Sequence, residues 1–125
     1  SNILALLPSL VTPSSPIETP DQKQQGFQRA IAALSEQVAK KEAKRDSARL
    51  KLEQMITSLN VPDEVAAVDN DTGFSIPSLR SYWPYFKARQ EWRDTDDMIR
   101  FLNRKLEVTE TSMELEPAPS SENSK

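Results

Sequence analysis

The fold is decided by residues 19–60, which read TPDQKQQGFQRAIAALSEQVAKKEAKRDSARLKLEQMITSLN. The stretch opens with a hydroxyl residue, a proline and an acid, and Gln22 follows three residues after the hydroxyl. This order caps and starts an α-helix. No further proline occurs before Asn60, and the only glycine, Gly26, lies near the beginning. The stretch therefore predicts one long helix over about residues 20–60.

The apolar residues of this helix recur every seven positions, as the a and d positions of a coiled coil do. The series consists of Phe27/Ile31, Leu34/Val38, Lys41/Arg45, Ala48/Leu52 and Met55/Leu59. One of its layers is therefore polar. At about 1.5 Å per residue the helix is roughly 60 Å long, which is too long to be buried on a compact core in a chain of this size. It needs a partner helix.

A second helix is predicted over about residues 81–115, after a connector at 61–80 that is rich in proline and turn-forming residues. Ser78 or Ser81 is expected to cap it, and Pro84 fits only in its first turn. Its own seven-residue series consists of Tyr85/Ala88, Trp92/Thr95, Ile99/Leu102 and Leu106/Thr109 to Met113. We therefore predict an all-α protein, with two long amphipathic helices forming an antiparallel helical hairpin or coiled coil.

Aromatic side chains gather where the second helix begins. Five of the eight aromatic residues are Tyr82, Trp83, Tyr85, Phe86 and Trp92. Such a concentration predicts a local cluster that anchors the connector. The same side chains could stack on nucleic-acid bases, but their helical spacing favours packing.

The two series together predict a register. Folding about a connector centred near residue 68 gives the expected neighbours: Leu59 with Leu79, Ala48 with Tyr85–Ala88, and Lys41/Arg45 with Trp92–Asp97. The acids Asp94, Asp96 and Asp97 would then neutralise the basic layer and set the register, with little net gain in stability. In the alternative, Lys41 and Arg45 extend their charged ends into solvent.

The two ends of the chain have a different composition. Residues 1–19 form a proline- and serine-rich segment with an apolar patch at Ile3–Val11, and we expect a flexible arm that docks on a partner. Residues 116–125 are expected to be disordered. Thr12, Ser15 and Thr19 each precede a proline and are candidate phosphorylation sites. No segment is apolar enough to predict a membrane span or a signal peptide.

The composition argues against catalysis. The chain has no cysteine and no histidine, which excludes a thiolate nucleophile, a cysteine-ligated zinc site and the commonest general base. Two isolated glycines cannot form a phosphate-binding loop. The acidic groups at 63–71 and 94–97 lack the spacing of a calcium loop. We therefore expect neither an enzyme nor a cofactor.

We expect the chain to be an interaction protein, because Phe27, Ile31 and Leu34 face only the weaker, C-terminal half of the second helix. The expected partner-binding residues are Phe27, Ile31, Leu34, Val38, Lys41, Arg45, Leu52, Ile99, Leu102 and Leu106. The predicted role is a non-enzymatic helical scaffold subunit that assembles with other helical chains in an intracellular complex, nuclear or cytoplasmic. Partners are other protein subunits, with a hetero-oligomer favoured over a homo-oligomer.

Two alternatives remain open. A homo-oligomeric bundle could bind nucleic acid through a basic face at residues 40–51, which carries Lys40, Lys41, Lys44, Arg45, Arg49 and Lys51. The chain's net charge of −3 weakens any long-range attraction to phosphate. A peripheral membrane protein could instead use the patch at Ile3–Val11.

Overall fold

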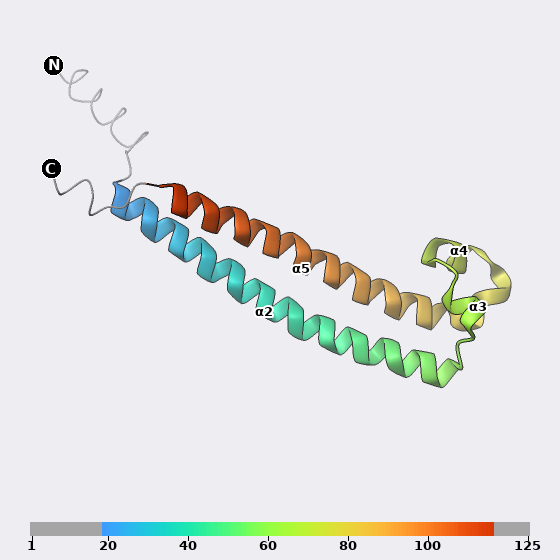
Figure 1. Cartoon of the computed structure of the whole chain (residues 1–125). Coiled ribbons are helices and arrows are strands. Elements are labelled where there is room, and N and C mark those ends of the chain that lie inside the picture. Colours follow the sequence, from blue (N-terminus) through green and yellow to red (C-terminus); the bar gives the residue numbers. More distant parts are fainter. Residues whose placement is uncertain (1–18, 117–125) are drawn as a thin grey trace, which may run out of the picture.

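The computed structural model describes residues 19–116, and all regular structure in this range is helical. The elements are α2 (Pro20–Leu59), α3 (Asp63–Ala66), α4 (Asn70–Ser75), the 3-10 helix η2 (Pro77–Tyr82) and α5 (Trp83–Leu115). The long helices α2 and α5 lie side by side, and the short elements gather at one end (Figure 1). The predicted all-α architecture with two long, packed helices is confirmed. Apart from Thr19 and Glu116, the expected arm and tail lie outside the described residues.

Helix α2 begins with the predicted cap. The Thr19 hydroxyl accepts a hydrogen bond from the Gln22 amide at 3.1 Å, and the Thr19 amide donates to the Gln22 side-chain oxygen at 2.9 Å. The helix ends at Asn60, which adopts a left-handed backbone with φ 47° and ψ 56°. Asparagine tolerates this conformation better than most residues, so it can close a helix. Both ends of α2 are therefore encoded locally.

The seven-residue series of α2 lies on the face that is turned toward α5. From Phe27 to Asn60, every position in the series is buried or half-buried, and every other position is exposed. Leu34 and Val38 form a buried cluster with Leu102, and Leu106 packs against it. Contacts between residues early in α2 and late in α5 mean that the two helices run in opposite directions (Figure 1).

The predicted register is correct at Arg45, which contacts Asp96, but it needs a correction at Ala48. Ala48 lines the same hollow as Thr95, rather than lying beside Tyr85–Ala88. The reason is that α2 ends at Leu59 whereas α5 starts only at Trp83, so the connector is centred near residue 71. Near the connector the predicted pairing is found, because Leu59 and Leu79 pack on one cluster.

The connector folds around a core of its own, built on Val65, Tyr85 and Phe86. The partly buried residues around it are Leu52, Met55, Leu59, Val61, Val68, Leu79, Tyr82 and Trp83. Four of the five predicted anchor aromatics thus meet at one place. The fifth, Trp92, is half-buried farther along α5, where the Arg49 guanidinium lies 5.8 Å from its ring centre.

The predicted serine caps of the second helix are wrong. Tyr82 occupies the cap position of α5 without a side-chain hydrogen bond, because η2 runs directly into the helix. Pro84 lies in the first turn, as predicted. Within the connector, a side-chain cap forms at the start of α4, where an Asp69 carboxylate oxygen accepts a hydrogen bond from the Thr72 amide at 2.8 Å. This hydrogen bond lowers the pKa of Asp69.

Candidate functional site

A buried arginine ties the connector to α5. Arg89 is only 7% exposed, and its guanidinium donates hydrogen bonds to the carbonyl oxygens of Ala66 and Val68. It also donates to the Asn70 side-chain oxygen at 2.8 Å and to the Tyr85 hydroxyl at 3.0 Å. The network is saturated, since every buried side-chain nitrogen and oxygen in residues 19–116 has a partner. Its role is therefore to hold the backbone in place.

Asn70 extends this network from α4. Its side chain is buried, and its amide nitrogen donates to the Phe86 carbonyl at 3.1 Å and to the Gln90 side chain at 2.8 Å. Neither Arg89 nor Asn70 stood out in the sequence. Charged and amide side chains are normally solvated, so no local pattern marks the few that are buried.

The aromatic cluster includes a residue that the sequence did not single out. The Phe74 ring packs edge-on against the rings of Trp83 and Phe86, with centroid distances of 6.1 and 5.8 Å. Phe86 is completely buried, and its ring lies against Gly73, where a Cβ atom would come within 2.6 Å. The Trp83 indole donates to the Gly73 carbonyl at 3.1 Å. Gly73 is therefore required by close packing.

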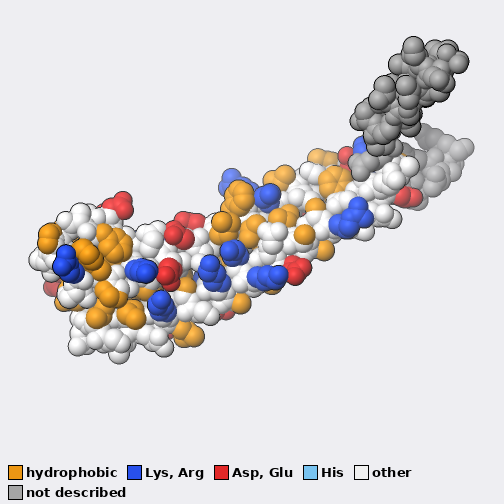
Figure 2. All heavy atoms as spheres, turned by 180° about the vertical axis from the view of Figure 1, so that it is seen from behind, with side chains coloured by type: hydrophobic (Ala, Val, Ile, Leu, Met, Phe, Trp, Pro, Cys, Tyr) orange, Lys and Arg blue, Asp and Glu red, His pale blue; other side chains and the backbone are white. Residues whose placement is uncertain are grey.

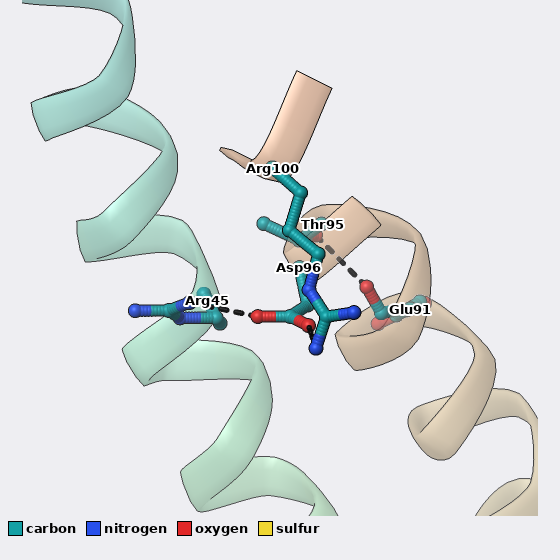
Figure 3. Close-up of polar contacts among 5 residues, drawn as sticks. All are labelled: Arg45, Glu91, Thr95, Asp96 and Arg100. Atoms are coloured by element: carbon teal, nitrogen blue, oxygen red, sulfur yellow. Dashed lines mark hydrogen bonds and ion pairs between the residues drawn. The ribbon is translucent and has the colours of Figure 1, made fainter. Parts of the chain in front are cut away.

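The polar layer between the long helices contains an ion pair. Arg45 Nη1 of α2 lies 2.7 Å from Asp96 Oδ1 of α5, and Asp96 Oδ2 lies 3.2 Å from Arg100 Nη2 (Figure 3). The Asp96 side chain is only 14% exposed. Of the three predicted acids, Asp96 thus neutralises the layer at Arg45. Lys41, one turn earlier, is half-buried.

Most of the predicted partner-binding residues lie in the seam between α2 and α5. Leu34, Val38, Ile99 and Leu102 are buried, whereas Phe27, Ile31, Lys41, Arg45, Leu52 and Leu106 are half-buried. The expectation that Leu34 needs another chain is corrected, because Leu102 and Leu106 of the same chain cover it. Leu34 is thus covered from within the chain.

An exposed apolar surface lies on α5. Four of its large apolar side chains are exposed, at spacings of three, seven and seven residues: Met98, Phe101, Val108 and Leu115. We call these four residues the outward stripe. Phe101 and Val108 are 57% and 60% exposed, whereas their neighbours Leu102 and Leu106 face α2. A space-filling view shows hydrophobic side chains gathered along the long helices, with lysine and arginine beside them (Figure 2). Helix α5 thus has two apolar faces.

One hollow between the long helices is lined mostly by polar and charged residues. It has a volume of about 480 Å³ and is lined by Lys44, Ser47, Ala48, Lys51, Glu91, Asp94 and Thr95. The small side chains of Ala48 and Thr95 leave this space open. Lys51 and Glu91 approach each other across it at 3.8 Å. Because the lining charges are of both signs, the hollow does not select an anion or a cation.

The basic face at residues 40–51 is largely neutralised within the chain. Four of its six basic residues contact a carboxylate, in the pairs Lys40–Glu36, Arg45–Asp96, Arg49–Glu53 and Lys51–Glu91. These pairs lower the positive potential that would attract phosphate.

Of the three candidate phosphorylation sites, Thr19 alone lies within the described residues. Thr12 and Ser15 lie outside the described residues. The Thr19 hydroxyl accepts the capping hydrogen bond of α2. A phosphate there would replace this hydroxyl at the positive end of the helix, where negative charge is favourable. Modification of Thr19 therefore stays a prediction that is compatible with the helix start.

Two further properties concern residues 19–116 as a whole. No helix in this range is long and apolar enough to cross a membrane. The same residues contain no cluster of three or more acidic side chains arranged to hold a metal ion. Comparison with protein-family models, with curated proteins and with solved structures found no match for this chain.

Proposed function

We propose that this protein is a non-enzymatic helical scaffold subunit that binds other helical chains through the outward stripe of α5, within an intracellular complex. The observation that carries the proposal is the spacing of Met98, Phe101, Val108 and Leu115 on an exposed face. Single exposed apolar residues are ordinary on protein surfaces. Four at helical spacing on one face match the pattern by which one helix packs on another.

In this proposal the residues of the seam hold the two helices together, and the opposite side of α5 binds the partner. In this arrangement α2 and α5 form an antiparallel coiled-coil hairpin, and α2 braces α5 from behind. A helix that is already held straight loses little conformational entropy when a partner binds. The buried cluster at Leu34, Val38 and Leu102 supports this division, because it leaves the outward stripe free of a structural task.

Protein partners are better supported than nucleic acid. The ion pairs at residues 40–51 satisfy four basic side chains, and both Arg45 and Lys51 contact acids on α5. The whole chain carries a net charge of −3. Counterion release from phosphate needs unpaired cations, so the proposal does not include binding to DNA or RNA.

Affinity purification tests the proposal. The full chain carries either Phe101→Asp with Val108→Asp, or the matched control Leu50→Asp at a residue of α2 that is 61% exposed. We expect the double variant to lose the co-purifying proteins and the control to keep them. Circular dichroism checks that both remain helical. Changes at Ile31 or Leu34 are unsuitable, because these residues lie in the seam.

The opposite result would refute the proposed site. If the double variant is fully helical and still recovers the same proteins in the same amounts, the outward stripe does not bind them. Loss of partners from the Leu50→Asp control as well would mean that recovery depends on surface charge in general, which also argues against this site.

A further inference from the structure

Charged residues flank the N-terminal end of the outward stripe, and their sign changes from negative to positive along α5. Asp94 lies about one turn before Met98 and Asp97 directly precedes it, whereas Arg104 and Lys105 lie about one turn after Phe101. All four charged side chains are exposed. In the described part of the chain, none of the four takes part in an ion pair, although other charges on both helices do. The surface therefore carries two negative charges at one end of an apolar centre and two positive charges at the other.

We propose that the occupant of this surface is a second copy of the chain, with the two α5 helices packed antiparallel about a twofold axis between Met98 and Phe101. This inference rests on the proposed function and names the partner for the same site. In such a contact, residues at equal distances on either side of the axis face each other. Met98 then meets Phe101 of the second copy, and Phe101 meets its Met98.

The charged residues fit the same axis. Along α5, the midpoint between Asp94 and Lys105 coincides with the midpoint between Met98 and Phe101, and the midpoint between Asp97 and Arg104 lies within one residue of it. Asp97 therefore faces Arg104 of the second copy, and Asp94 faces its Lys105. Twofold symmetry repeats each pair, so four complementary contacts surround the apolar centre. Asp97 and Arg104 are seven residues apart and thus lie on the same edge of the stripe, where side chains on antiparallel helices can meet.

A parallel pairing of the same helices is unfavourable. It would place Asp97 opposite Asp97 and Arg104 opposite Arg104, and like charges at an interface oppose association. The sign reversal along α5 therefore selects the antiparallel arrangement. An unrelated helix on the stripe would need its own complementary charges, whereas the second copy already carries them.

Sedimentation equilibrium of the full chain tests the proposal. We expect the unmodified protein to form a dimer and Phe101→Asp to be monomeric, while the control Leu50→Asp remains dimeric. Two charge-reversed chains sharpen the test. One carries Asp94→Lys with Asp97→Lys, and the other carries Arg104→Glu with Lys105→Glu. Each alone should dimerise more than about tenfold more weakly, because both pairs become repulsive.

Mixing the two charge-reversed chains should restore a dimer. In the mixture, each reversed residue meets a residue of opposite sign on the other chain, so the heterodimer regains all four contacts. A chain that had merely misfolded could not be rescued in this way. Circular dichroism of each chain alone provides a second check of folding.

Three results would overturn the second-copy inference: a monomeric unmodified chain, a dimer that charge reversal leaves unchanged, or no heterodimer on mixing. The monomeric result includes the case in which residues 1–18 occupy the stripe, which their removal would reveal as a newly formed dimer. These failures leave the proposed function standing if Phe101→Asp with Val108→Asp still abolishes partner recovery. If that variant also keeps its partners, both proposals fail.

Discussion

At the scale of single residues, the connector end of the molecule depends on Arg89. Its guanidinium reaches the carbonyls of Ala66 and Val68, and it also holds Asn70 and Tyr85. The planar fork of donors allows one side chain to satisfy acceptors from two segments at once. A single buried cation thus fixes how α3 and α4 sit on α5.

Replacing Arg89 by methionine should therefore be costly. The apolar stem is kept, but two carbonyls and two side-chain acceptors lose their donor, which we expect to lower the free energy of unfolding by about 3 kcal/mol. Urea denaturation followed by circular dichroism measures this value. Arg89→Lys should recover little of it, because an ammonium cannot span the same acceptors. A loss under about 0.5 kcal/mol for Arg89→Met would contradict the assigned role.

The two glycines offer a matched pair of substitutions. In Gly73→Ala, the new methyl group would lie 2.6 Å from the buried ring of Phe86, and overpacking of this kind costs about 2 kcal/mol. In Gly26→Ala, the methyl group meets nothing within 4 Å, and α2 should gain up to about 1 kcal/mol from the better helix former. Thermal unfolding of both variants should show shifts of opposite sign. Shifts of the same sign would mean that close packing is not what Gly73 provides.

Residue-level roles were the least predictable from the sequence. Gly73 reads as a turn former within Asn70–Gly73, although its task is to admit the ring of Phe86. Arg89 reads as a solvated helix residue, although it is buried. Both roles arise from contacts between segments distant in the chain, and no local pattern encodes such contacts.

At the scale of elements, the long helices were predictable and the connector was not. The period of seven in α2 and α5 repeats over many turns, so each position of the series is supported by its neighbours. Helices α3 and α4 have four and six residues, too few for any period to be visible. The stripe at Met98 and Phe101 was missed because the a/d series beside it already accounted for the helix.

The polar layer of the seam should control its register. Changing Lys41 and Arg45 together to leucine removes the contact with Asp96 and makes the α2 side of the seam uniformly apolar. We expect helices that slide relative to each other, because leucine layers pack equally well in several registers. The chain lacks cysteine, so spin labels can be placed on cysteines introduced at Ala39 and Glu107.

The distance distribution between these labels is the measurement. It should be narrow for the unmodified seam and broad or double for the leucine variant. If the variant instead keeps a single narrow distribution and melts at a higher temperature, the polar layer does not set the register. Lys41 and Arg45 would then be tolerated in the seam only because their stems are apolar.

At the scale of the whole molecule, the two ends of the helical pair are held very differently. At the connector end, Phe86 is fully buried among aromatic side chains and the Arg89 network closes over α4. At the other end, Phe27 and Ile31 are only half-buried, and Leu115 is 80% exposed. Local stability follows the density of buried contacts. It should therefore fall along the molecule, away from the connector.

Hydrogen exchange followed by mass spectrometry tests this gradient. Amides of α2 near Leu52 and of α5 near Ala88 should exchange only through global unfolding, whereas those at 22–30 and 108–115 should exchange at least about tenfold faster through local opening.

The same measurement distinguishes protection by the seam from protection by a partner on the outward stripe. If a second copy binds α5 around Met98, raising the protein concentration should slow exchange at 94–105 of α5 and leave the facing residues of α2 nearly unchanged. Uniform slowing along both helices would instead indicate that association stabilises the seam itself, and exchange independent of concentration would argue against any contact between copies.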